Sequence, residues 1–203
     1  SPLAENCRYR HAQVLLTVFA VMTSTTSVYA VRMPPPMDGN GTPEDPYKVS
    51  TLEHLKWISE HSYVWNEHFR QTADIDASDT STWNDGKGFS PIGRRSRFAG
   101  PFTGTYDGAH HTIDNLYINR PDTPRVGLFG LVEQGDSEPI EDSTTPTGEI
   151  SHLGVTNADI TGKSDVGGLV GQYGQALETI KDCYTTGKVE ATGNTSYVSV
   201  GGL

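Results

Sequence analysis

Apolar residues in this chain come in short clusters that are broken by glycine, asparagine, aspartate and threonine. Within the clusters the aliphatic residues alternate or pair, as Leu116 does with Ile118 and Leu153 with Val155. The segments that hold these clusters do not repeat apolar residues at the three- and four-residue spacing of an amphipathic helix. The pattern therefore predicts an all-β fold of many short strands joined by turns.

Residues 47–62, YKVSTLEHLKWISEHS, are the exception to this pattern. Leu52, Leu55 and Ile58 fall on one face of a helix, and the serine and threonine before them can cap its N-terminus. We expect a helix over about residues 50–62. It would cover the exposed edge and the apolar end of the first β coil, both of which need a cap.

Three segments of the chain share an opening element and a closing element. The opening is isoleucine, two polar residues and an apolar residue or cysteine, and the closing is Val-Gly with an aliphatic pair. The openings begin at Ile113, Ile150 and Ile180, and the closings at Val126, Val166 and Val200. A fixed element with elastic connections and a period of this size indicates a solenoid, in which like strands of successive repeats pair in register. Because the apolar pattern is that of strands, we expect a parallel β-helix.

The Val-Gly element has a physical role in such a fold. Glycine lets the chain bend at a corner of the coil, or lets neighbouring backbones approach closely, while valine and leucine point into the stack. The repeat-defining residues are Val126, Gly127, Leu128 and Gly130, then Val166, Gly167, Gly168, Leu169 and Gly171, then Val200, Gly201, Gly202 and Leu203. Because the sequence stops inside the third copy, we expect a fragment of a longer protein whose β-helix is incomplete at its C-terminal end.

The first thirty residues have the layout of a secretory signal peptide. Two arginines precede the apolar run 14–22, and a small-residue site ends at Ala30. The alternative is a short membrane anchor, but a run of this length is too short for a span, which needs about 20 apolar residues. We therefore expect cleavage after Ala30, no transmembrane span in the mature chain, and a secreted or cell-surface location. The expected layout is a signal peptide at 1–30, a Pro/Gly-rich lead at 31–46 and the β-helix at 47–203, with its repeats at about 113–203.

Charge and cysteine content narrow the partners and the chemistry. The net charge of −10 becomes −11 once the signal peptide, with its two arginines and one glutamate, is removed. This acidity argues against nucleic acid and anionic membrane surfaces as partners. Cys183 is the single cysteine of the mature sequence, so no intramolecular disulfide can form. We expect it to be a small buried hydrophobe.

Several stretches together resemble the exported bacterial proteins that carry GLUG repeats. They are GNGTPEDPYKVSTLEHLKWIS, TADIDAS, SPIG, FTGTYDGAHHTIDNLYI and the VGLFG, VGGLVG and VGGL elements. The resemblance spans about residues 39–203, and residues 168–171 match the Gly-Leu-aliphatic-Gly element that names the family. The resemblance implies a right-handed parallel β-helix and a surface or extracellular setting, as in adhesin-like proteins. GLUG repeats also occur beside immunoglobulin-A-cleaving metallopeptidase domains, yet the resemblance carries over no catalytic residue.

No motif in the sequence specifies a metal or cofactor site. Three histidines spaced by seven residues, starting at His54, lack the closer spacing of adjacent metal ligands, and HExxH is absent. Asp74, Asp76 and Asp79 are weak candidates for binding Ca²⁺ through their oxygen atoms. However, DIDASD lacks the glycine of an EF-hand loop, and Asp at the end of a strand commonly bonds backbone amides. We therefore expect no metal and no cofactor.

Two kinds of surface group remain as candidates. Trp83, Tyr117 and Tyr173 could stack on sugar faces. Charged residues of the kinds that glycosidases and lyases need are also present, but they are spread over turns and no spacing joins them. These charged residues are Arg94, Arg95, Arg97, Asp107, Asp114 and Lys163.

The function that fits these observations is a non-enzymatic structural or adhesion module that presents a binding surface. Its partner would be a glycan or a surface protein of a host or neighbouring cell. The alternatives are a polysaccharide-degrading β-helix, either a lyase or a hydrolase, and the scaffold region of a larger secreted metallopeptidase. Clustering of the charged candidates in one cleft would favour an enzyme, whereas scatter would favour the module.

Overall fold

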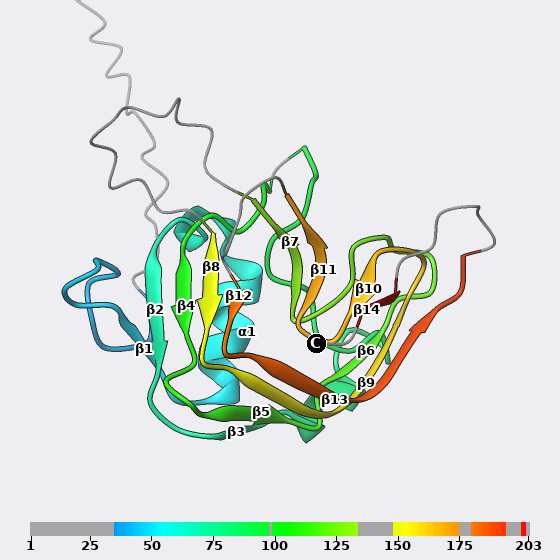
Figure 1. Ribbon diagram of the computed structural model, residues 1–203, viewed down its shortest axis with the longest axis horizontal. Helices are drawn as coiled ribbons and strands as arrows, with labels where there is room; N and C mark the ends of the chain where they lie inside the picture. The colour runs from blue at the N-terminus through cyan, green and yellow to red at the C-terminus, as the bar shows by residue number, and fades with distance from the viewer. Residues whose placement is uncertain (1–34, 98, 134–147, 175–179, 194–199, 202–203) are drawn as a thin grey trace, which may run out of the picture. The chain divides into compact units, whose positions relative to one another are not determined.

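The computed structural model describes residues 35–97, 99–133, 148–174, 180–193 and 200–201, the last two without their side chains. They belong to one compact unit, Pro34–Leu203, and form short strands, one α-helix and two 3-10 helices (Figure 1). The all-β prediction is confirmed in this general form. In the described part of the chain, no helix is long and apolar enough to cross a membrane. The predicted signal peptide, Gly202 and Leu203 lie outside the described residues.

Five parallel strands form a first sheet, called sheet A. In order they are β1 (Tyr47–Val49), β2 (His68–Gln71), β4 (Thr105–Asp107), β8 (Glu149–Ser151) and β12 (Ile180–Lys181). Their register places Tyr47, Phe69, Tyr106, Ile150 and Ile180 in one column. Parallel neighbours cannot be joined by a tight hairpin, so the chain makes a wide circuit before each new strand of the sheet begins. Each such circuit of the chain is called a pass.

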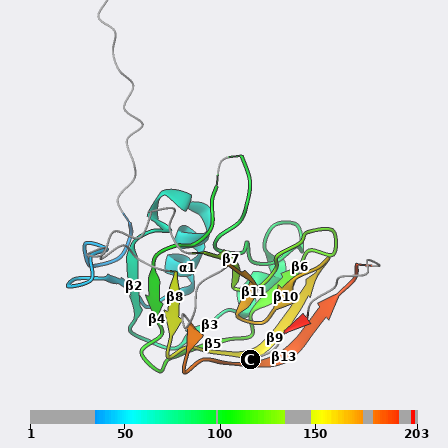
Figure 2. The ribbon, with the colours of Figure 1, turned by 45° about the horizontal axis from the view of Figure 1, so that its top comes forward.

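A second parallel sheet, called sheet B, follows sheet A in each pass. Its order is β3 (Ile75–Asp76), β5 (Thr112–Asp114), β9 (Gly154–Gly162) and β13 (Tyr184–Ala191), and β6 (Tyr117–Asn119) also pairs with β9. One column holds Ile75, Ile113, Val155 and Thr185, and another holds Ile118, Ile160 and Val189. In both views of the ribbon, sheet A runs round a bend into sheet B (Figures 1 and 2).

Two pairs of short parallel strands complete the passes. β7 (Phe129–Val132) pairs with β11 (Val170–Tyr173), and β10 (Val166–Gly167) pairs with β14 (Val200–Gly201). A parallel bridge joins Val126 to Val166, and Val166 in turn is in register with Val200. The three Val-Gly elements therefore lie next to one another in successive passes, as the repeat predicted.

The opening element of the first repeat was placed wrongly. Ile150 and Ile180 are register partners, but the partner of Ile150 in the preceding pass is Tyr106. Ile113 instead belongs to sheet B, where it pairs with Ile75 and Val155. The sequence pattern missed this because an aromatic residue takes the aliphatic position in that pass.

The helix α1 (Leu52–Glu60) agrees with the predicted range of about 50–62. Its N-cap is Thr51, whose Oγ1 accepts a hydrogen bond from the backbone N–H of His54 at 3.2 Å. Leu55 and Ile58 are fully buried and belong to the same hydrophobic cluster as the sheet residues. The amphipathic face therefore packs on the core. Two 3-10 helices, η1 (Ser62–Val64) and η2 (Ser78–Thr82), follow on either side of β2.

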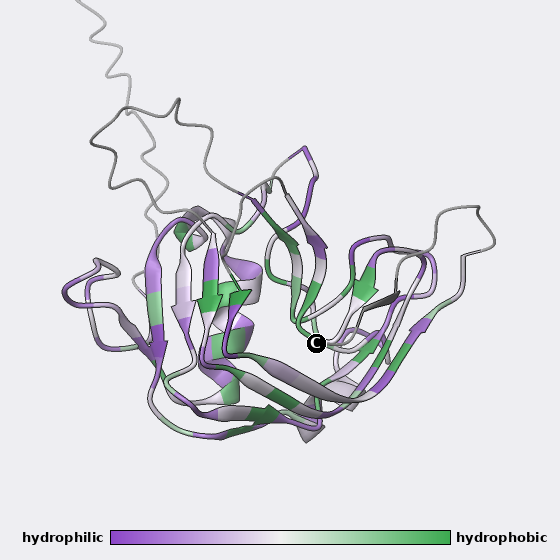
Figure 3. Cartoon of the chain, in the orientation of Figure 1, coloured by the Kyte–Doolittle hydropathy of each residue, from purple (hydrophilic) through white to green (hydrophobic). Residues whose placement is uncertain are grey.

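Burial falls toward the last pass that the structure describes. Ile150, Val155 and Ile160 are fully buried, whereas their partners in the next pass are only partly buried. These partners are Ile180, Thr185 and Val189. Figure 3 shows hydrophobic positions side by side on β8 and β12. Apolar side chains at register positions of successive passes thus stack into one continuous core.

Candidate binding surface

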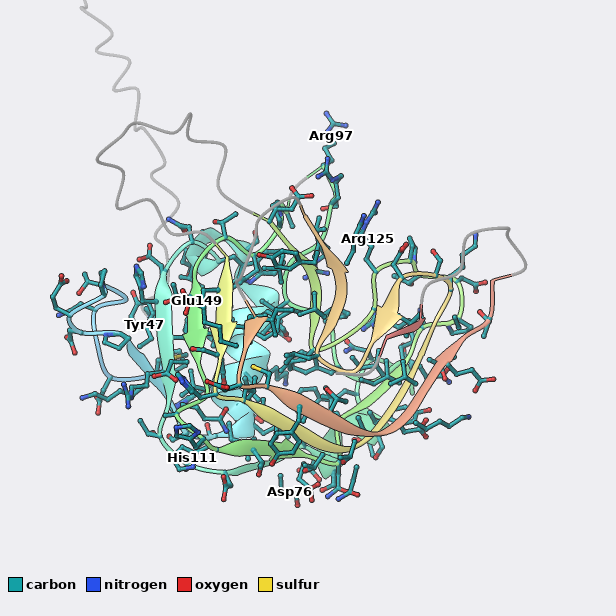
Figure 4. The ribbon with its side chains drawn as sticks, in the orientation of Figure 1. Tyr47, Asp76, Arg97, His111, Arg125 and Glu149 are labelled. Carbon is teal, nitrogen blue, oxygen red and sulfur yellow. The ribbon has the colours of Figure 1, made fainter. Side chains whose placement is uncertain are left out.

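A hollow of about 280 Å³ lies between the C-terminal half of α1 and the segment that follows η2. It is called the Trp83 hollow, and its lining residues are Lys56, Ser59, Glu60, Trp83, Asn84 and Ser90. Two further hollows, of about 360 and 500 Å³, are lined by polar and charged residues together with glycine, alanine and proline, and neither lining includes an aromatic residue. Arg97, at the rim of the larger one, projects away from the strands (Figure 4).

Trp83 is fixed at the end of η2 and is half-buried. Its backbone N–H donates to the carbonyl of Thr80, and its ring lies 6.4 Å from the ring of Phe89 at an angle of 31°. The ammonium of Lys56 is 5.0 Å from the centre of the Trp83 ring, a cation–π distance. One part of the indole thus packs against the core residue Phe89, and another part lines the hollow.

Hydrogen bonds hold the polar walls of the Trp83 hollow in place. Nδ2 of Asn84 donates to the carbonyl of Gly88 at 2.7 Å, and Oγ of Ser59 donates to the carbonyl of Lys56 at 2.7 Å. Oγ of Ser90 accepts a hydrogen bond from the guanidinium of Arg120 at 2.9 Å. Burial lowers the pKa of Arg120, and the nearby charge of Arg94 lowers it further.

The two other aromatic candidates, Tyr117 and Tyr173, do not line this hollow. Tyr117 is half-buried in β6, and its backbone N–H donates to Oγ1 of Thr80 at 3.0 Å. Tyr173 is half-buried at the end of β11, and burial raises its pKa. The three aromatic candidates therefore do not form one platform.

The acidic stretch around Asp74 bonds backbone amides. Asp74 accepts from the N–H of Thr112 at 2.9 Å, and this bond, helped by His111, lowers the pKa of Asp74. Asp76 accepts from the N–H of Ser78 at 2.9 Å, which lowers its pKa in the same way. Figure 4 shows Asp76 and His111 on the side of sheet B that faces away from α1. Among the described residues, no group of three or more His, Cys, Asp and Glu could hold a metal ion. Asp74, Asp76 and Asp79 therefore do not form such a group.

The three histidines that start at His54 each have a separate partner. His54 bonds the N–H of Ser50, His61 bonds the carbonyl of Trp57, and His68 bonds the hydroxyl of Thr105. His61 also stacks on the ring of Trp57 at 4.2 Å. These contacts place all three in structural roles.

The charged candidates for catalysis are held by different partners. Arg94 donates to the carbonyl of Ser59 and lies over the ring of Trp65, and Arg95 pairs with Glu133. Asp114 accepts from Thr156 and Asn157, along the outer face of sheet B. Lys163 is exposed beyond the end of β9. Arg95 and Arg97 line one hollow together with Glu133, whereas Arg94 and Asp114 bond Ser59 and Thr156 elsewhere in the described part of the chain.

Sequence reasoning named Asp107 as a charged candidate but missed the cluster of Arg, His and Asp side chains around it, at the bend between sheets A and B. Asp107 pairs with Arg70 at 3.1 Å and with Nδ1 of His152 at 3.1 Å. The other ring nitrogen of His152 lies 3.7 Å from Asp182, and the ring of His110 is 4.8 Å from that of His152. The members come from four successive passes, those of β2, β4, β8 and β12. These residues come together through the strand register, and the sequence pattern predicted that register wrongly for this segment.

No family model matches the chain. The chain is 40% identical over 183 residues to halomucin of Haloquadratum walsbyi, a match that covers 89% of this chain and 2% of halomucin. It is 31% identical over 126 residues to a protein assigned as a Gly-rich membrane protein of Evansella cellulosilytica, covering 59% of this chain and 13% of that protein. The chain thus spans a small part of the length of either relative.

A solved structure with a similar fold comes from Bacteroides ovatus and is assigned as an immunoglobulin A1 protease. The TM-score is 0.50 with 20% sequence identity, and the match covers 75% of this chain and 50% of that chain. At this identity the likeness concerns the fold and carries no activity over to this chain. The relatives in sequence and the neighbour in structure are thus longer chains, of which this chain matches a part.

Proposed function

We propose that this chain is an exported, non-catalytic structural module that works at the cell surface or outside the cell. In this proposal residues 47–203 form a right-handed parallel β-helix of the GLUG-repeat type, capped at its start by α1. The lead at 31–46 precedes it, and the signal peptide at 1–30 is removed after Ala30.

The observation that carries the proposal is the register that continues from pass to pass. Val126, Val166 and Val200 are neighbours, and the columns of sheets A and B run through the same passes. Stacked strands of this kind add about 4.8 Å of length per pass and bury a continuous core. Such a stack makes a rigid spacer without any cofactor.

Four further observations support the proposal. The sequence relatives are named halomucin and a Gly-rich membrane protein, and the acidic charge suits a protein that must stay soluble outside the cell. Three of the charged candidates for catalysis, Arg94, Arg95 and Asp114, bond different partners, which supports a non-catalytic role. A binding surface with an aromatic residue at its centre fits a module that presents a ligand site.

The test is expression of the whole chain in a bacterial host, followed by fractionation and N-terminal sequencing. The proposal expects protein outside the cytoplasm that begins at Val31. The same material, incubated with acidic polysaccharides, should release no unsaturated products that absorb in the ultraviolet. Retention in the cytoplasm would contradict export, and release of such products would show a lyase.

A further inference from the structure

We infer that the Trp83 hollow binds a neutral saccharide, of one or two sugar rings or at the end of a longer glycan. This inference rests on the proposed function, because it names the ligand class of the surface that the module presents. The hollow of about 280 Å³ lies just below the range of about 300–1,000 Å³ that is typical for drug-sized ligands, and so suits a small one.

The aromatic ring supplies the apolar contact that a sugar needs. Trp83 is half-buried, so it presents part of a large and rigid surface to the hollow at little cost in side-chain entropy. The Lys56 ammonium now lies 5.0 Å from the ring centre. Since lysine has a long and flexible side chain, it can swing from the ring to a ligand hydroxyl while sugar C–H groups take its place.

The walls of the Trp83 hollow carry both hydrogen-bond donors and hydrogen-bond acceptors. Ser90 Oγ accepts from Arg120, so its own O–H is directed elsewhere and can donate to a ligand. Asn84 uses its Nδ2 on Gly88, which leaves its Oδ1 as an acceptor. Lys56 adds a donor and Glu60 adds an acceptor. A sugar hydroxyl both donates and accepts, so it matches such a mixed set.

Charge selects a neutral ligand over an acidic one. The lining of the hollow holds one lysine and one glutamate, so its own side chains sum to zero. The lining includes the acidic residue Glu60, and Asn84 makes its bond to Gly88 through Nδ2 and not through Oδ1. Arg94 and Arg120 bond Ser59 and Ser90 and are engaged with backbone carbonyls. Lys56 is thus the cation of the lining that a uronate or sulfate would meet, and Glu60 would oppose either one.

The experiment titrates the whole 203-residue chain with maltotetraose, cellotetraose and chitotetraose, and with tetragalacturonate as the acidic comparison. Binding is followed by calorimetry and by the indole N–H resonance of Trp83, assigned with Trp83→Phe. At least one neutral tetrasaccharide should bind and tetragalacturonate should not. Trp83→Ala should weaken the binding by about tenfold or more, the loss expected when an aromatic anchor is truncated. Trp83→Tyr should keep most of it.

Two controls separate binding from folding. Tyr184→Ala removes another partly exposed aromatic residue, on β13, and should leave the affinity unchanged. Glu60→Ala changes an exposed residue at the end of α1 and should weaken binding without altering the fold, checked by circular dichroism. The inference is overturned if no neutral tetrasaccharide binds, if Trp83→Ala binds as the parent does, or if tetragalacturonate binds better. None of these results affects export or the absence of lyase products, which test the proposed function separately.

Discussion

Gly171 shows why glycine recurs beside valine in this chain. A Cβ atom built on Gly171 would lie 2.6 Å from the backbone nitrogen of Val126 and 2.8 Å from the carbonyl oxygen of Asp165. One on Gly127 would lie 2.9 Å from the carbonyl oxygen of Gly167. None of these glycines has a positive φ. Both roles that the sequence suggested are therefore observed: the chain bends at Gly127 and Gly168, and backbones approach closely at Gly127 and Gly171.

We expect Gly171→Ala to destabilise the fold by about 1–3 kcal/mol, the usual cost of forcing an extra group into a packed site. The atoms that its Cβ would meet are backbone atoms, which cannot swing aside. Thermal unfolding followed by circular dichroism measures the change. Gly100→Ala is the matched control, because nothing lies within 4 Å of a Cβ at that exposed position. Equal melting temperatures for the two variants would show that the close approach is not needed.

Tyr106 is a second residue whose role depends on burial. It is fully buried, and its hydroxyl donates to Oε1 of Gln71 at 3.1 Å. Gln71 is also fully buried, and its Nε2 donates to two backbone carbonyls. Tyr106→Phe should therefore cost about 1–3 kcal/mol at neutral pH, because an acceptor of Gln71 loses its partner. Urea unfolding measures this cost, and an unchanged midpoint would contradict it.

The same tyrosine predicts a pH dependence. Burial raises the pKa of Tyr106 above its ordinary value of 10.0. The folded state therefore holds this proton more tightly than the unfolded state, and the stability is complete below about pH 10 and falls as the pH rises above it. The parent protein should lose stability in this alkaline range more steeply than Tyr106→Phe does. Parallel slopes of stability against pH would contradict the prediction.

At the scale of the element, the helix was the easiest part to predict. Its signals are local: a capping threonine, and apolar residues spaced to fall on one face. The Val-Gly corners were also predictable, because the same short pattern recurs three times. The opening at Ile113 was not, because strand register is set by long-range packing, and Tyr106 fills the position that isoleucine fills in the next two passes.

The Trp83 hollow was predictable only in part. Trp83 could be named as a candidate aromatic residue from its place in a polar loop. Lys56, Ser59 and Glu60 could not be joined to it, since nothing local records that the end of α1 packs beside the segment after η2. The charged cluster around Asp107 was missed for a similar reason, as its members meet only through the pairing of successive passes.

The helix α1 should stabilise the module as a whole. Leu55→Ala removes a fully buried side chain from the joint core of helix and sheets, so we expect a loss of about 2–5 kcal/mol. Glu53→Ala, an exposed residue of the same helix, should change the stability by less than about 0.5 kcal/mol. Chemical denaturation of both variants measures the difference. A similar midpoint for the two would mean that α1 does not cap the core.

At the scale of the whole molecule, stability should fall from the middle of the stack toward its last described pass. Ile160 is fully buried, and Val189, its partner in the next pass, is only partly buried. Ile160→Ala should therefore cost about 2–5 kcal/mol and Val189→Ala about 1 kcal/mol. Native-state hydrogen exchange should likewise protect the amides of β9 more than those of β13. Equal protection of the two strands would contradict this gradient.

The register of the valine corners bears on how such a chain can grow in evolution. The interval from Val126 to Val166 is longer than that from Val166 to Val200, yet all three remain aligned. Differences in length are thus absorbed between strands or at an irregularity such as the one between Thr185 and Gly187, where the pairing of β13 with β9 shifts by one residue. An uncorrected slip of one residue would turn the apolar side chains of a strand to the solvent. Duplication of the DNA that encodes one whole pass is the step that avoids this penalty. The strands of each copied pass would pair in register with the strands of the pass before it.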